Sequence, residues 1–370
     1  MMRGTVRKED IDTPALLIDL DIMEKNIRTM AEYLKGKTVK LRPHVKTHKT
    51  PIISHKQIAA GAIGVTCQKL GEAEVMASAA IRDILISNQI VGDQKVKRLV
   101  SLAKHCNVIV GVDNLENVRH LSEEALRKGV KLKVAMEMNM GRCGVEMGKP
   151  AVEFAKEVVK MRGLCFEGIW GHGAGQVYNV HNFEERKRRH VAGLMRMIET
   201  RDMIEDAGID VNIVSEGWTS TYNITAEVPG ITEIQAGSYV FMDRVYKMFE
   251  GLEAFDIALT VLATVTSRPK PDLAILDAGL KAIAQEASDN YKNLIMPVVK
   301  DVEGANLFAL SEEHGWVRLE NPSRDLKVGD KVELIPCHCC TTCNLHDRYY
   351  GIRDGELEVI WSIPARGKMA

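Results

Sequence analysis

LRPHVKTHKT, residues 41–50, is the stretch that most strongly restricts how this chain folds. On a β-strand Arg42, His44 and Lys46 share one face, and the residues between them share the other. His48 is a further candidate for the basic face. Basic groups that face the inside of a sheet need a partner, because isolated buried charges are expensive. An anionic phosphorylated cofactor, bound as an imine to one lysine, would be such a partner. A basic strand end exposed to water is the alternative, and spacing alone leaves both open.

Around this stretch, from about residue 15 to residue 250, short apolar runs alternate with amphipathic helical segments such as 94–104 and 115–128. Repeated β-then-α units imply parallel strands with crossover helices, and about eight units favour a closed barrel over an open doubly wound sheet. No G-x-G-x-x-G follows the first run, which argues against a dinucleotide-binding fold. The strand candidates are ALLIDL (15–20), VKLRPHV (39–45), AIGVTC (62–67), DILISN (83–88), NVIVGVD (107–113), LKVAMEMN (132–139), CFEGIWG (165–171), VNIVS (211–215) and ITEIQAG (231–237).

The pattern changes after about residue 255, where helical periodicity largely disappears. Short β-rich runs separated by Gly, Pro and Asp indicate an antiparallel β domain. We therefore predict an α/β fold: a (β/α)8 TIM-like barrel over residues 15–255 and a C-terminal β domain over residues 256–370, which residues 1–14 join. The runs are ALTVLATVTS (258–267), LAILDAG (273–279), LFALS (307–311), GWVRLE (315–320), KVELIPCHC (331–339), RYYGI (348–352) and LEVIWSI (357–363).

The composition is that of an ordinary enzyme, with 45% hydrophobic residues, 27% charged residues and a formal net charge of −1. Near-neutral charge removes any electrostatic case for binding nucleic acid or an anionic membrane. No apolar run approaches the roughly 20 residues that span a bilayer. The N-terminal residues lack the apolar core of a secretory signal, so we expect a cytoplasmic protein.

Several motifs resemble those of one known family. DTPALLIDLDIMEKNI (12–27) followed by RPHVKTHKTP (42–51) resembles the D-serine dehydratase / D-threonine aldolase family of pyridoxal-phosphate (PLP) enzymes. The resemblance implies an alanine-racemase-like fold (PLP fold type III), a small-molecule D-amino acid substrate and a homodimer. It continues in order along nearly the whole chain, through NMGRCGVE (139–146), IWGHGAGQVY (169–178), SEGWTSTY (215–222), ITEIQAGSYVFMD (231–243), LDAGLKA (276–282), SEEHG (311–315), PCHCCTTCNLHD (336–347) and WSIPARGK (361–368).

The same resemblance implies roles for individual residues. Lys46 would be the imine lysine and the catalytic residue, and His44 beside it would also bind the cofactor. Arg142 would contact the phenolic oxygen of the cofactor, and Tyr178 lies in the region that flanks its ring. Glycine-rich turns suit the phosphate because their backbone N–H groups can approach an anion closely. Family members often carry a small residue where this chain has Trp218. The residues implied to hold the phosphate are Gly217, Trp218, Thr219, Gly237, Ser238 and Tyr239.

Residues 337–343, CHCCTTC, form a second constellation. On a strand His338 and Cys340 share one face, and an imidazole with a thiolate is a sound pair of zinc ligands that leaves positions open for water and substrate. The resemblance places a metal on this pair, with Zn²⁺ favoured and Mn²⁺ or Mg²⁺ as alternatives. A structural zinc that uses Cys340 and Cys343, or merely buried thiols, are other interpretations. Cys337, Cys339 and Cys343 receive no role.

The resemblance implies a lyase that acts on D-3-hydroxy amino acids. By the same resemblance, dehydratases of the family tend to carry His-x-Cys and aldolases His-x-Asp, so the triplet His338-Cys339-Cys340 favours a dehydratase, which converts D-serine or D-3-hydroxyaspartate into a 2-oxo acid and ammonia. A D-threonine-type aldolase, which gives glycine and an aldehyde, is the alternative. An amino-acid racemase would share the fold without needing the metal, and a non-catalytic PLP-binding protein would need only the barrel.

Overall fold

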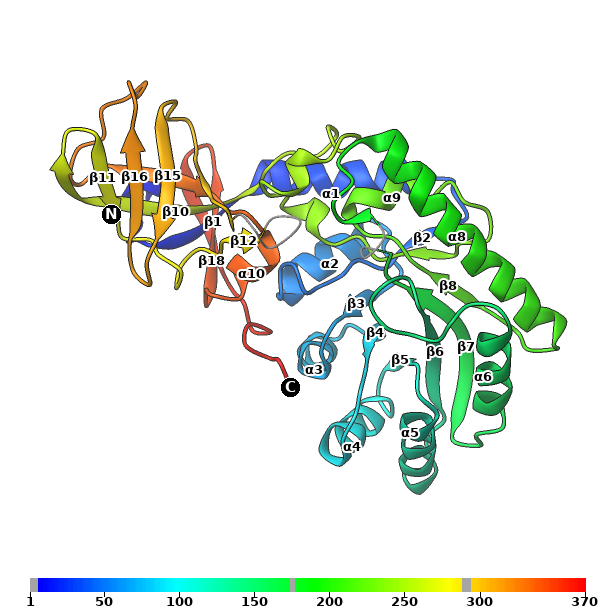
Figure 1. Cartoon of the computed structure of the whole chain (residues 1–370). Coiled ribbons are helices and arrows are strands. Elements are labelled where there is room, and N and C mark those ends of the chain that lie inside the picture. The colour runs from blue at the N-terminus through cyan, green and yellow to red at the C-terminus, as the bar shows by residue number, and fades with distance from the viewer. Residues whose placement is uncertain (1–5, 174–176, 288–293) are drawn as a thin grey trace.

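The computed structural model describes residues 6–173, 177–287 and 294–370, and these contain two large sheets (Figure 1). One is an eight-stranded parallel sheet in the order β2-β9-β8-β7-β6-β5-β4-β3. After β2, the N–H of Val45 donates to the carbonyl of Thr66, and the N–H of Thr66 donates to the carbonyl of Pro43. The segment that follows β2 therefore hydrogen-bonds to β3, the strand at the opposite edge of the sheet. The predicted alanine-racemase-like α/β fold is confirmed. The strands are β2 (Lys40–Leu41), β3 (Val65–Cys67), β4 (Asp83–Gln89), β5 (Asn107–Val112), β6 (Leu132–Met138), β7 (Leu164–Gly171), β8 (Ile213–Ser215) and β9 (Glu233–Ile234).

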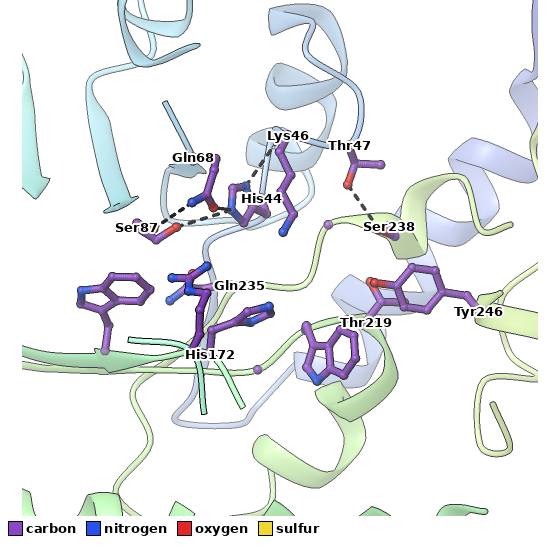
Figure 2. Close-up of a pocket in the computed structure, with 15 residues that line it drawn as sticks. His44, Lys46, Thr47, Gln68, Ser87, His172, Thr219, Gln235, Ser238 and Tyr246 are labelled. Carbon is purple, nitrogen blue, oxygen red and sulfur yellow. Dashed lines mark hydrogen bonds between the residues drawn. The ribbon is translucent and has the colours of Figure 1, made fainter. Parts of the chain in front are cut away.

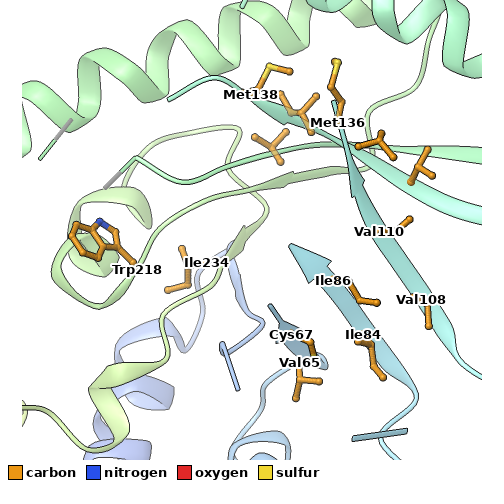
Figure 3. Packing of buried hydrophobic residues seen from close by; sticks show 14 of the residues in the cluster. Val65, Cys67, Ile84, Ile86, Val108, Val110, Met136, Met138, Trp218 and Ile234 are labelled. Atoms are coloured by element: carbon orange, nitrogen blue, oxygen red, sulfur yellow. The ribbon is translucent and has the colours of Figure 1, made fainter. Parts of the chain in front are cut away.

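Successive residues of these strands face opposite sides of the sheet. Val108 and Val110 of β5 belong to the large core that the helices share (Figure 3), whereas Ile109 between them packs with Trp170 in a separate buried cluster. Gly111 makes room for Trp170, because a Cβ there would lie 2.8 Å from the indole ring. Large side chains thus fill the interior of the barrel, which leaves its ends for a site.

Several helices around the barrel begin at residues that favour a helix start. Pro51 occupies the first turn of α2, and the side chains of Asn114 and Asn182 accept backbone N–H groups at the starts of α5 and α8. These helices cover the outside of the sheet (Figure 1). They are α2 (Pro51–Ala59), α3 (Leu70–Ser78), α4 (Asp93–Leu102), α5 (Leu115–Arg127), α6 (Lys149–Val159), α8 (Phe183–Asp206) and α9 (Tyr222–Thr225), with 3₁₀ turns η2 (Thr219–Thr221), η3 (Ser238–Val240) and η4 (Tyr246–Met248).

The first strand candidate, ALLIDL, does not belong to the barrel, so the prediction of a barrel that starts at residue 15 needs correction. Strand β1 (Ala15–Asp19) pairs antiparallel with β10 and parallel with β18 in the second sheet. Its two faces pack into two different apolar clusters, with Leu16 in one and Leu17 in the other, which explains its continuous apolar run. Asp19 caps the following helix α1 (Leu20–Leu34), which runs from this sheet toward the barrel (Figure 1).

The second sheet has the order β15-β16-β11-β10-β1-β18-β19, and β17 joins β10 to β14. Its pairs are antiparallel except for β1 with β18. A division of the chain at residues 255 and 256 stays a prediction. The remaining elements are η1 (Lys8–Asp10), β10 (Leu259–Lys270), β11 (Leu273–Leu276), β12 (Glu286–Ala287), β13 (Leu294–Ile295), β14 (Val298–Val299), β15 (Ala305–Leu310), β16 (Gly315–Leu319), β17 (Lys331–Ile335), α10 (Cys339–Cys343), β18 (Arg348–Arg353) and β19 (Glu356–Ser362).

In the described part of the chain, no helix has the length and apolar character that a membrane crossing requires.

Candidate active site

A pocket opens where the barrel strands end, and most of the predicted cofactor residues line it (Figure 2). Figure 2 shows Lys46 pointing into this space, with His172 on one side and Tyr246 on the other. Tyr178 and Tyr239 do not line the pocket. The predicted residues that the pocket brings together are His44, Lys46, Arg142, Gly217, Trp218, Thr219, Gly237 and Ser238.

Lys46 lies in a turn that begins at Val45, because the strand ends early. Its N–H donates to Nδ1 of His44 at 3.4 Å. The Nε2 atom of His44 lies 3.2 Å from Oε1 of Gln68 and 3.4 Å from Oγ of Ser87. Burial, with the nearby charge of Lys46, holds the pKa of His44 well below its ordinary value. A neutral imidazole therefore lies beside the lysine.

Arg42 and His48 do not share the pocket with Lys46, which corrects the prediction of a single basic face. Arg42 binds Glu233 through Nε at 2.9 Å and Nη2 at 2.8 Å, and it also contacts Asp83. The basic charge thus has carboxylate partners from the protein itself. His48 is fully buried outside the pocket lining. The strand period ends with the strand, so residues beyond it no longer alternate.

Two glycine turns form a polar concave surface next to Lys46. Gly217 has φ +100°, which side-chain-bearing residues rarely adopt, and a Cβ on Gly237 would lie 2.5 Å from the carbonyl oxygen of His44. The hydroxyl of Thr219 accepts the N–H of Tyr239 at 3.0 Å, which ties the two turns together. Tyr239 itself points behind them, where its hydroxyl accepts a hydrogen bond from Gln57. Backbone and hydroxyl groups of such turns, where they line a pocket, suit an anion.

Arg142 reaches the pocket from the loop after β6 and is held by a carboxylate that the sequence analysis missed. Its Nη2 donates to Oε1 of Glu137 at 2.7 Å, and its guanidinium lies 6.0 Å from the ring centre of Trp170. Glu137 is only 1% exposed, and Gln89 donates to its other oxygen. The signal was present, since Glu137 is a charged residue in the apolar run LKVAMEMN. Buried charges in such runs need partners.

Trp218 is the centre of an aromatic wall on one side of the pocket. Its ring stacks on Tyr178 at 5.8 Å, and the rings of His172 and Tyr246 lie 5.7 and 6.4 Å away. Tyr178 thus adjoins a lining residue without lining the pocket itself. Burial, with the charge of Lys46, lowers the pKa of His172 to about 3, so this imidazole is neutral near pH 7.

Glu216 connects two pocket segments from behind. Its Oε1 accepts the N–H of Gly173 at 2.9 Å, and its Oε2 lies 3.0 Å from Nε2 of His190. Both Glu216 and His190 are fully buried. The carboxylate therefore fixes the residues that follow β7 relative to the Gly217 turn. Sequence reasoning missed it, as it missed the pocket-lining Gln68, Ser87, Gln235 and Tyr246, because single polar residues carry no periodic signal.

The second constellation forms a cluster in which ligand atoms of His338, Cys339 and Cys340 all lie within 4.8 Å of one another. The strand predicted there is wrong: β17 ends at Ile335, and Cys339 begins helix α10. His338 and Cys340 come together in a helix start instead of on one strand face. Cys343, at the end of α10, is not part of this cluster.

Asp243 orients the cluster from the barrel side. Its Oδ2 lies 3.0 Å from Nδ1 of His338 and accepts the N–H of Cys339 at 2.9 Å. A carboxylate on one imidazole nitrogen is the usual arrangement when the other nitrogen binds a metal. Cys340 faces the pocket, since its Sγ lies 3.4 Å from Oγ1 of Thr47 and 3.7 Å from Oγ of Ser238.

The electrostatics of the cluster favour an ionised Cys340. A hydrogen bond from the Cys339 thiol outweighs burial and, with the positive charge of His338, holds the pKa of Cys340 well below its ordinary value. For His338, burial opposes the charged form, yet Cys340 and Asp243 raise its pKa well above the usual range. Burial raises the pKa of Cys343, and it raises that of Cys337 to about 12. One thiol of the segment is therefore poised as a thiolate.

Family models define the class of protein. Residues 18–245 match the alanine racemase N-terminal domain, and residues 258–352 match the model described as "Putative serine dehydratase domain". The chain therefore belongs to the alanine-racemase-like proteins that carry this second domain.

Comparison with individual relatives identifies the family more specifically. The chain is 36% identical to 3-hydroxy-D-aspartate aldolase of Paracoccus denitrificans, over 98% of this chain and 94% of the relative. Its structure resembles that of D-threonine aldolase from Filomicrobium marinum, with a TM-score of 0.93, 37% identity and coverage of 100% and 99%. D-threo-3-hydroxyaspartate dehydratase from Delftia sp. HT23 is 28% identical, with a TM-score of 0.85 and coverage of 96% and 98%. The chain is a member of the D-threonine aldolase / D-serine dehydratase family, as its motifs indicate.

Proposed function

We propose that this protein is a PLP- and metal-dependent lyase of D-3-hydroxy amino acids. One observation carries the proposal: Thr47, next to the predicted cofactor lysine, lies 3.4 Å from both Ser238 of the glycine turns and Cys340 of the metal cluster. Two constellations almost 300 residues apart in the sequence thus converge on one space. A cofactor on Lys46 and a metal on Cys340 would act on the same substrate.

The pocket residues fit PLP. Lys46 would hold the cofactor covalently, the turns at Gly217 and Gly237 would hold its phosphate, and Arg142 would contact the ring oxygen. The fit rests on the polar pocket that Lys46, the two glycine turns and Arg142 line together. Bound PLP would supply an electron sink for negative charge at the α-carbon of an amino acid.

The residues of the cluster fit a divalent metal, with Zn²⁺ favoured by the thiolate. Asp243 holds Nδ1 of His338, which leaves the other ring nitrogen for the metal. A bound metal would act as a Lewis acid on the β-hydroxyl of the substrate. Mn²⁺ and Mg²⁺ prefer oxygen ligands and are the weaker alternatives.

Two reactions are known in this family, and they differ in which proton of the substrate is removed. In dehydration, Nζ of Lys46 would take the α-proton while hydroxide leaves the β-carbon, which yields a 2-oxo acid and ammonia after hydrolysis. In aldol cleavage, the β-hydroxyl would lose its proton, the Cα–Cβ bond would break and the α-carbon would take up a proton, which would yield an aldehyde and glycine. The His-x-Cys triplet that contains Cys340 supports dehydration, because the family resemblance links this triplet to dehydratases. The aldolases at 36–37% identity, against 28% for a dehydratase, support cleavage, and we favour cleavage.

The test is incubation of the PLP- and zinc-loaded enzyme with D-threonine, D-serine and D-3-hydroxyaspartate, with ammonia and glycine measured separately. We expect glycine and the matching aldehyde, with the L-isomers inert. Ammonia and a 2-oxo acid in place of glycine would establish the dehydratase. Only racemised amino acid, or no product, would overturn the lyase proposal. The homodimer and the cytoplasmic location also stay predictions.

A further inference from the structure

A buried ion pair lies close to Lys46 in the sequence, and the proposed function makes no use of it. Nζ of Lys49 donates to Oε1 of Glu72, in the first turn of α3, at 2.6 Å. Lys49 is 5% exposed and Glu72 is 1% exposed. A buried ion pair is weak evidence for stability, because the loss of hydration of both charges offsets much of their attraction. The other contacts of the two residues supply a different explanation.

Glu72 connects the turn that carries Lys46 to the wall of the pocket. Its Oε1 atom accepts from Lys49, whereas its Oε2 atom accepts the backbone N–H of Gln68 at 2.8 Å and that of Lys69 at 3.1 Å. The Oε2 atom alone caps the start of α3, and capping by a carboxylate needs no cation. A cation near the start of a helix is unfavourable, because that end carries partial positive charge. Helix capping therefore does not explain why Lys49 is there.

Gln68 in turn holds the imidazole of His44 inside the pocket (Figure 2). The side-chain nitrogen of Gln68 donates to the carbonyl of Ser87 at 3.4 Å, and its Oε1 lies 3.2 Å from Nε2 of His44. Nδ1 of His44 accepts the N–H of Lys46, so the proton of the neutral ring lies on Nε2, where Gln68 accepts it. The amide of Gln68 thus selects one tautomer of the ring beside Lys46.

The backbone of Lys49 adopts a strained conformation. Its φ is +52°, in the left-handed region that is unfavourable for a residue with a side chain. The N–H of Lys49 donates to the carbonyl of Val45 at 2.7 Å, and its carbonyl accepts the N–H of Ala365 at 3.1 Å, which together hold this conformation. Strain of this kind clusters at functional sites. Lys46 lies in the turn between Val45 and Lys49, so the strained residue closes the turn that carries the predicted cofactor lysine.

We propose that Lys49 and Glu72 are positioning residues for Lys46 and His44. One carboxylate holds the Lys46 turn through Lys49 and the His44 ring through Gln68, so the lysine and the imidazole keep one relative orientation. Neither Lys49 nor Glu72 lines the pocket, so both act through their neighbours. This inference rests on the proposed function in one respect, that Lys46 binds PLP. It adds the buried pair that aims Lys46 at the cofactor.

The experiment separates positioning from stability with the double variant Lys49→Met/Glu72→Gln. This variant leaves neither charge unpaired, and the new amide oxygen can still accept N–H groups at the start of α3, so the unfolding midpoint in denaturant should stay near the wild-type value. The rate at which the cofactor-stripped, full-length protein reacts with added PLP, followed by visible absorbance, should fall on the order of 10²-fold, because Lys46 is misplaced. For the loaded enzyme, kcat and kcat/KM should fall together.

Glu74→Gln is the matched control, because Glu74 also lies on α3 and pairs with a cation, Arg98, at 2.6 Å, but does not line the pocket. It should keep the wild-type rate of reaction with PLP and the wild-type kcat. The single variants Lys49→Met and Glu72→Gln each leave one buried charge without its partner. Their unfolding midpoints should therefore lie below that of the double variant.

A double variant that folds and reacts with PLP at the wild-type rate would overturn the positioning role and leave the proposed function intact. A double variant that does not fold would also overturn it, because the pair would then serve stability. An equal loss in Glu74→Gln would do the same, since it would show a general effect of removing a charge from α3. Wild-type protein that forms no adduct with PLP on Lys46 would overturn this inference together with the cofactor part of the proposed function.

Discussion

The pocket of the barrel draws its lining residues from the ends of many strands, from His44 near β2 to Ser238 beyond β9. The metal cluster, in contrast, comes from three consecutive residues, 338–340, at the start of one short helix. The pocket therefore depends on closure of the whole barrel, whereas the cluster depends on one turn and on Asp243. The two halves of one site can therefore be disturbed separately, and the variants described next are chosen to separate them.

The largest effect is expected from Lys46→Ala. The variant should lose lyase activity by about 10²–10⁴-fold, as expected when a positioned proton-transfer group is removed, while zinc binding stays unchanged. Borohydride treatment of the wild-type enzyme followed by peptide mapping should place the pyridoxyl label on Lys46. Lys69→Ala is the control and should behave as wild type. Recovery of the label on Lys49 or Lys69 would refute the assignment.

Asp243→Asn should weaken zinc binding by about 10- to 100-fold, since it removes the carboxylate that orients His338. The visible absorbance of the bound cofactor should not change, because the variant touches the cluster and not the Lys46 turn. Chelator competition and an absorbance spectrum measure the two effects on one sample. Loss of both metal and cofactor would show that the two halves are not separable.

Glu137→Gln should weaken cofactor binding on the order of tenfold, because Arg142 loses a charge-assisted hydrogen bond at 2.7 Å. Zinc affinity should stay at the wild-type value. Dialysis against a PLP scavenger measures cofactor loss. Glu146→Gln, an exposed carboxylate in the same loop that bonds Asn139, is the matched control. Equal cofactor loss in both variants would argue against a role for Glu137.

The smallest effect concerns stability in mild acid. Burial lowers the pKa of His48 to about 4 from an ordinary 6.5, so the folded protein binds fewer protons there than the unfolded chain. The contribution of neutral His48 to the free energy of unfolding is complete above pH 6.5 and is lost as the pH falls toward 4. The free energy of unfolding should therefore fall by about 1 kcal/mol between pH 6.5 and pH 5.5. Denaturant unfolding at these two pH values should show the loss, and His48→Asn should reduce it. An unchanged pH slope in the variant would contradict this origin.

Much of the barrel follows from the sequence because its strands are buried on both faces and its helices are amphipathic. Each of the eight candidates from residue 39 to residue 237 overlaps one strand of the barrel, although β2 and β9 are only two residues long. The β1 run looks the same as these, since it too is buried on both sides, and its sheet depends on which partner it meets. The strand predicted from periodicity at residues 338–340 was also wrong, because helix α10 starts there, within a cysteine-rich run.

The sequence by itself determined the alternation of strands and helices, the family motifs and the presence of a reactive lysine and a thiol-rich segment, because these are local patterns. Only the tertiary structure decided that Arg42 faces Glu233 instead of the pocket, that Glu137 holds Arg142, and that Asp243 reaches His338 from 95 residues away. The physical reason is that a buried charge or ligand takes its orientation from its partner. Such partners are chosen by the packing of distant segments, which no local period records.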